Sequence, residues 1–269
     1  MAITAADVKK LRDLTSAGMM DAKKALEEAD GDFDKAVEVL RVKGQAKAEK
    51  RAGEREATAG LVAAAGNALV ELKSETDFVA KNPDFVATAQ RIAEAADAAK
   101  ATDVETLKGV ALDGSTVGEV VSNLAITIGE KIELGEVAWF DGNTTVYLHK
   151  RASDLPAAVG VLIEYEGDEA AARGAAMQVA AMRAQYLSRD EVPADIVEAE
   201  RDVLTKKTLE EGKPEAAVAK IVEGRLGAFF KDIVLLEQES VTESKKSVKD
   251  VLDAAGTTVK RFARFEVGA

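Results

Sequence analysis

The first 42 residues carry apolar side chains at helical spacing, interrupted by short polar turns. Three segments show this pattern, and their apolar positions are Val8, Leu11 and Leu14 in the first, Met19, Leu26 and Ala29 in the second, and Phe33, Ala36, Val37 and Leu40 in the third. Thr4 with Asp7 gives a start signal for the first helix, and Asp30-Gly31 ends the second. The pattern predicts a three-helix N-terminal module over residues 1–44.

A charged stretch follows this module. Residues 43–59 combine charges of both signs with few large apolar side chains, and Gly44 and Gly53 punctuate them. Gly44 is predicted to end the third helix. We expect a charged segment over residues 45–59, either a solvated linker or an exposed helix.

From Gly60 the apolar pattern changes to that of strands. The segments on either side of Gly66-Asn67 predict a β-hairpin. Asn82 before Pro83 is a favourable helix start, because the side chain can cap and proline fits the first helical position. The buried stripe of this helix is expected to contain Phe85, Ala89, Ile92, Ala93 and Ala96.

The remainder of the chain repeats the order of strands followed by a helix. A second strand set covers residues 132–140, 145–149 and 159–165, with a turn at Asp141-Gly142, before an alanine-rich helix at 168–185. Residues 193–230 predict a helical hairpin that is broken at Gly212-Lys213-Pro214. A last helix ending at Gly256 and a strand of alternating apolar residues return to the core.

This order predicts an α+β fold. We expect the three-helix module to be followed by a core of two similar α+β subdomains, residues 60–140 and 141–269, with the hairpin 193–230 protruding from the second. Identity between the two halves is too low to establish an internal repeat from sequence alone.

Composition restricts the ligands. Lys and Arg number 36 against 48 Asp and Glu, a net charge of −12 that repels a phosphate backbone, so no direct nucleic-acid binding is expected. No apolar run approaches the roughly 18 residues of a membrane span, so we expect no membrane partner. The N-terminus shows neither a secretory signal nor a transit peptide. We therefore expect a cytoplasmic protein.

The residue types needed for most catalysis are scarce. Absence of cysteine excludes thiol nucleophiles and cysteine-based zinc sites, and the sole histidine, His149, excludes a multi-histidine metal site. We expect no cofactor, no metal site and no catalytic residue. A hydrolase using carboxylates such as Glu75 and Asp77 stays an alternative, although the chain lacks a Gly-rich phosphate loop and a nucleophile elbow.

Six segments together carry a family resemblance. The longest runs from Leu11 to Phe33, LRDLTSAGMMDAKKALEEADGDF, and the others are TDFVAKN at 76–82, IGEKI at 128–132, GKP at 212–214, VEGRL at 222–226 and RFEV at 264–267. Their joint presence in this order resembles the bacterial elongation factor Ts family, and the resemblance covers essentially the whole chain. The resemblance implies a ubiquitin-associated-like N-terminal bundle and guanine-nucleotide exchange on the GTPase elongation factor Tu, without chemistry by this chain.

Phe78 follows a predicted strand, in a connection where no regular element requires an aromatic side chain. The residues alone leave two interpretations open, an anchor in the core or a protruding contact with a partner. The resemblance favours the second. It implies that Thr76, Asp77, Phe78 and Val79 enter the GTPase near its nucleotide and displace magnesium.

A second candidate contact lies at the start of the second helix. Met19 and Met20 alone are typical core-filling residues, and we expect one to pack and one to reach outward. The resemblance implies that Met19, Met20 and Lys23 bind the GTPase. His149 is either a lone imidazole without a titration role or, by the resemblance, near the partner. A different function also stays open, in which residues 1–44 act as a ubiquitin-associated-type adaptor.

Overall fold

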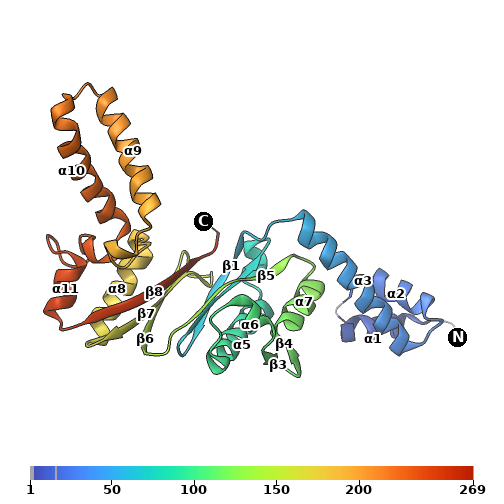
Figure 1. Cartoon of the computed structure of the whole chain (residues 1–269). Coiled ribbons are helices and arrows are strands. Elements are labelled where there is room, and N and C mark those ends of the chain that lie inside the picture. The colour runs from blue at the N-terminus through green and yellow to red at the C-terminus, as the bar shows by residue number, and fades with distance from the viewer. Residues whose placement is uncertain (1–2, 16, 269) are drawn as a thin grey trace.

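The computed structural model describes residues 3–15 and 17–268, which form the mixed α+β arrangement of Figure 1. Three helices begin the chain: α1 (Ala5–Thr15), α2 (Met19–Glu28) and α3 (Phe33–Glu54). Their apolar faces meet around Leu11 and Leu26, which are almost fully buried. The predicted three-helix bundle is confirmed, although Leu14 lies outside its core with 66% of its surface exposed.

The third helix was predicted to end at Gly44, but it continues to Glu54. Gly44 lies inside the helix and faces Ile126 of α7 (Val117–Ile128). A Cβ atom at position 44 would lie 2.7 Å from Ile126 Cγ2. Glycine at this position therefore permits a close helix–helix approach, and most of the charged stretch expected at residues 45–59 is helical.

The first sheet contains β1 (Ala59–Ala65), β2 (Ala68–Ser74) and β5 (Ile132–Trp139), antiparallel in the order β1-β2-β5. Its core face packs against α5 (Pro83–Ala99), α6 (Val104–Lys108) and α7. A small hairpin of β3 (Ala111–Leu112) and β4 (Ser115–Thr116) precedes α7. The five residues expected on the buried stripe of α5 are all fully buried, and Asn82 caps this helix as predicted.

The position of β5 corrects one expectation. Residues 132–140 were grouped with the second strand set, but β5 pairs with β2 through the register Ala68↔Trp139. The Asn67 side chain holds the end of this strand, because its amide donates to the carbonyl oxygens of Phe140 at 2.8 Å and Gly142 at 3.1 Å. The turn at Asp141-Gly142 therefore connects two sheets.

The second sheet has the order β6-β7-β8, with β6 (Asn143–Lys150), β7 (Ala157–Glu166) and β8 (Thr258–Glu266). Helices α8 (Glu169–Met182) and α11 (Val248–Ala254) pack on one face. The other face meets the first sheet at Gly160, where a Cβ atom would lie 2.4 Å from Val62 Cγ1 and 2.9 Å from Leu69 Cδ1. We propose to divide the core between the sheets, at residues 140 and 141.

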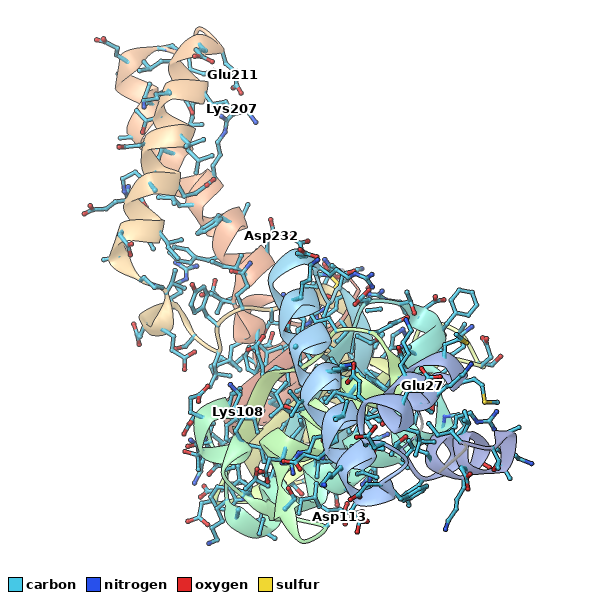
Figure 2. All side chains as sticks on the ribbon, turned by 90° about the vertical axis from the view of Figure 1, so that its right-hand side faces the viewer. Glu27, Lys108, Asp113, Lys207, Glu211 and Asp232 are labelled. Carbon is cyan, nitrogen blue, oxygen red and sulfur yellow. The ribbon has the colours of Figure 1, made fainter. Side chains whose placement is uncertain are left out.

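A helical hairpin of α9 (Ala194–Glu210) and α10 (Glu215–Ile233) projects from the second half of the core (Figure 1). Figure 2 shows Lys207 and Glu211 near its free end and Asp232 near its base. The short helices η1 (Arg189–Glu191) and η2 (Leu235–Glu237) flank this base, where Val234 is fully buried. None of the helices in the described part of the chain is long and apolar enough to cross a membrane.

Candidate partner-binding site

A one-turn helix, α4 (Asp77–Ala80), follows β2 and presents Phe78 to solvent. Thr76 is the N-cap, and its hydroxyl oxygen accepts from the Val79 backbone N–H at 3.4 Å. Val79 and Ala80 face inward with 8% and 2% of their surfaces exposed, whereas Phe78 is 81% exposed. We call residues 76–80 the Phe78 turn. The core-anchor interpretation of Phe78 is wrong, since the fold leaves the ring in water.

Two carboxylates hold this turn on the connection between α7 and β5. Glu130 accepts from the Thr76 backbone N–H at 3.1 Å and from the Thr76 hydroxyl at 2.8 Å. Glu75 accepts from the Lys131 backbone N–H at 2.6 Å and pairs with Arg55 at 2.8 Å. Sequence reasoning gave Glu130 no role and considered Glu75 only as an acid. The IGEKI segment was the available signal, but no local pattern links residues 54 positions apart.

A third contact ties the end of the turn to the second sheet. Lys81 donates to Asp154 in the loop between β6 and β7, with Nζ and Oδ2 2.9 Å apart. The hydrogen bond from Lys81 lowers the pKa of Asp154, and the same bond raises the pKa of Lys81. Both side chains are solvent-accessible, so their contact adds little to stability. It places the Phe78 turn where the two halves of the core meet.

The N-terminal module presents a separate apolar surface. Met19 is 47% exposed and Met20 is 63% exposed, so the expectation that one of them packs is wrong. Leu14 on α1 is exposed as well, while Lys23 pairs with Glu27 one turn further along α2 at 3.7 Å. The fold does not use these methionine side chains as core filler.

His149 lies on the edge strand β6 and is exposed. Its Nδ1 is 3.3 Å from the Tyr147 hydroxyl, and the two rings stack with centroids 6.2 Å apart. The predicted site residues therefore occupy three separate elements: α4 with its cap, α2, and β6. Within residues 3–15 and 17–268, no group of three or more His, Cys, Asp or Glu side chains is placed to hold a metal ion.

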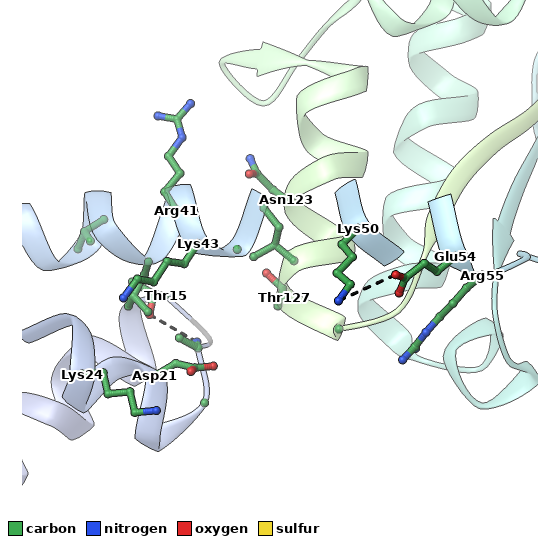
Figure 3. A pocket seen from close by; sticks show the side chains of 17 residues that line it. Thr15, Asp21, Lys24, Arg41, Lys43, Lys50, Glu54, Arg55, Asn123 and Thr127 are labelled. Carbon is green, nitrogen blue, oxygen red and sulfur yellow. Dashed lines mark hydrogen bonds and ion pairs between the residues drawn. The ribbon is translucent and has the colours of Figure 1, made fainter. Parts of the chain in front are cut away.

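A cleft of about 780 Å³ lies between the N-terminal module and α7, beside their contact at Gly44 and Ile126. Figure 3 shows Asn123 and Thr127 on α7 and Arg41 on α3, the two helices that line the cleft. Gly44 and Ile126 line the same cleft, so their contact forms part of its wall. Its charged lining is mostly basic: Lys24, Arg41, Lys43, Lys50 and Arg55, against Asp21 and Glu54.

Comparisons with known proteins agree on one family. The model of the family described as elongation factor TS matches residues 75–269. A protein named elongation factor Ts from a Nocardioides species is 72% identical over 267 residues, which cover 99% of each chain. Proteins of the same name from Cutibacterium acnes and Saccharopolyspora erythraea are 61% and 62% identical, covering 100% and 98% of each chain.

Proposed function

The chain belongs to the elongation factor Ts family, and on that premise we propose that it is the guanine-nucleotide exchange factor for elongation factor Tu. It binds the GDP-bound GTPase, inserts the loop formed by Thr76, Asp77, Phe78 and Val79 near the nucleotide, displaces magnesium and promotes GDP release so that GTP can bind. The factor acts by binding in the cytoplasm and performs no chemistry. It needs no cofactor, nucleic acid or membrane.

One observation carries this proposal: Phe78 is 81% exposed on a turn that the core holds in place. A large aromatic side chain that stays in water gains no burial free energy from folding. That free energy becomes available when a partner covers the ring. The turn therefore has the properties of a preformed insertion element rather than of a loop anchored in its own core.

Burial of the Phe78 ring alone cannot account for a large acceleration of GDP release. Burying a Phe side chain is worth about 1.5 to 3 kcal/mol. Accelerating GDP release ten-thousand-fold takes about 5.5 kcal/mol, at about 1.36 kcal/mol for each factor of ten. The rest must come from surfaces that bind the nucleotide-free GTPase better than the GDP form, and from loss of magnesium that neutralises phosphate charge. Reciprocity requires GDP to weaken factor binding equally.

The other predicted residues supply part of that wider surface. We propose that Met19, Met20 and Lys23 bind the GTPase through the N-terminal module, where both methionines are exposed. His149 contributes from β6, and the hairpin of α9 and α10 makes a smaller contact. The exposed position of these side chains supports the assignment.

The test is release of a fluorescent GDP analogue from elongation factor Tu. We expect the chain to accelerate release by orders of magnitude, and Phe78→Ala to lower the rate by about ten- to a hundredfold, the kinetic equivalent of the lost burial. Val241→Ala is the matched control, because Val241 is also exposed, at 52%, but lies in the segment before α11. Unchanged release with the wild-type chain would refute the proposal.

A further inference from the structure

Two reciprocal hydrogen bonds, each from a backbone N–H to a carboxylate, join the start of the Phe78 turn to the α7–β5 connection. Glu130 accepts from the backbone N–H of Thr76, and Glu75, the neighbour of Thr76, accepts from the backbone N–H of Lys131, the neighbour of Glu130. Each segment thus supplies the acceptor for the other's main chain. We call these two residues the carboxylate clamp.

The turn needs such support from outside itself. A helix of four residues cannot offset the cost of its own nucleation. Its only buried side chains are Val79 and Ala80, and its largest side chain, Phe78, is in water. Hydrogen bonds to ionised acceptors are among the stronger ones in proteins, and the Glu75 side chain is only 14% exposed. The clamp therefore supplies hydrogen bonds that stabilise the turn, which has too little buried surface and too few helical bonds of its own.

The clamp also reaches the end of α3, the helix that connects the N-terminal module to the core. Arg55, directly after α3, pairs with the second oxygen of Glu75 at 2.8 Å, and its carbonyl oxygen accepts from Lys131 Nζ at 3.2 Å. Helix α3 contacts α7 at Gly44 and Ile126, and α7 ends two residues before Glu130. Both helices that form the contact thus lead directly into the clamp.

We propose that Glu75 and Glu130 are positioning residues that hold Phe78 in its insertion geometry, and that Arg55 couples this geometry to the docking of the N-terminal module. The inference rests on the proposed exchange function, which it deepens. Neither carboxylate has to touch the GTPase, because both act through Phe78.

The first arm measures the turn in the free protein and does not depend on exchange activity. The chain contains no cysteine, so Phe78→Cys gives a unique site for a nitroxide spin label. We expect Glu130→Gln to increase label mobility, since an amide in place of the carboxylate cannot accept both Thr76 bonds. Glu133→Gln is the matched control. Among the described residues the Glu133 side chain pairs with Lys131 Nζ at 3.2 Å and not with Thr76, so its replacement should leave the label unchanged.

The second arm measures GDP release as a function of factor concentration. We expect Glu130→Gln and Glu75→Gln each to lower the maximal rate about tenfold, equivalent to about 1.4 kcal/mol. The concentration that gives half the maximal rate should change less than about twofold, because the rest of the interface is intact. Arg55→Gln should lower the maximal rate about threefold. The control Lys50→Gln should not, because among the described residues Lys50 pairs with Glu54 and not with the clamp.

A double variant separates positioning from a general structural role. If Glu130 acts through Phe78, then Glu130→Gln combined with Phe78→Ala should release GDP no more slowly than Phe78→Ala alone. Fully additive losses would overturn the inference, as would an ordered label with an unchanged maximal rate in both carboxylate variants. A wild-type chain that fails to accelerate release refutes the exchange function instead, and the spin-label arm still decides whether the clamp orders the turn.

Discussion

Replacing Gly44 with alanine tests the contact that orients α3 against the core. Two opposing effects follow from one methyl group. Alanine is favoured over glycine inside a helix by about 1 kcal/mol. The same methyl would lie 2.7 Å from Ile126 Cγ2, about 1 Å inside the normal carbon–carbon contact distance.

The structure predicts which effect dominates. The Ile126 methyl is attached to a branched Cβ and cannot swing away like the end of a flexible side chain, so the helices must separate. Overpacking of this kind costs about 1 to 3 kcal/mol, which outweighs or cancels the helix gain. We expect Gly44→Ala to be neutral or destabilising by up to about 2 kcal/mol.

Gly53 provides the control within the same helix. A Cβ atom there would meet nothing within 4 Å, so Gly53→Ala should be mildly stabilising. Denaturant unfolding followed by circular dichroism gives the free energies, and hydrogen exchange of the α3 and α7 amides locates the change. Adding Ile126→Ala to Gly44→Ala should recover part of the loss. Equal stabilisation by both glycine replacements would refute the packing of α3 on α7.

Three further replacements test the core and its charges. Phe85→Ala should lower the free energy of unfolding by about 3 to 5 kcal/mol because Phe85 is fully buried, whereas Phe78→Ala should change it by less than about 0.5 kcal/mol; urea denaturation compares them. Burial raises the pKa of Glu71, so its charged form opposes folding, and Glu71→Gln should stabilise the protein at pH 7. This gain should vanish below the ordinary pKa of 4.5, where Glu71 is protonated in both states, as thermal melts across pH would show.

Local signals in the sequence predicted local structure well. The Asn82-Pro83 start and the apolar stripe of α5 are confirmed, because a cap and a helical period depend only on neighbouring residues. Gly44 was misread because its partner, Ile126, lies far away in the sequence, and a glycine that permits close packing looks the same as one that ends a helix. The grouping of residues 132–140 with the second strand set was wrong for the same reason, since strand order depends on distant contacts.

The candidate site shows the same division. Thr76 could be identified as an N-cap residue type, but neither its bonds to Glu130 nor the exposure of Phe78 follows from the residues alone. Residue type even pointed the wrong way, because Phe is usually buried. Helices α6 and α7, and with them the connection that carries Glu130, were not predicted. Insertion of Phe78 into a partner was expected only through the family resemblance. The hydrogen bonds from Thr76 and Lys131 to Glu130 and Glu75 were visible only in the three-dimensional structure.

The magnitudes explain why the support of the turn matters as much as the ring. Fixing the backbone of one residue costs about 1 to 2 kcal/mol, so ordering the four residues of α4 during binding would cost about 4 to 8 kcal/mol. Covering Phe78 returns only about 1.5 to 3 kcal/mol. A loose turn would therefore bind with a net loss, and the aromatic side chain could not help to drive nucleotide release. An ordered turn incurs this cost during folding, where the burial of Val79 and Ala80 and the bonds to Glu130 and Glu75 offset it.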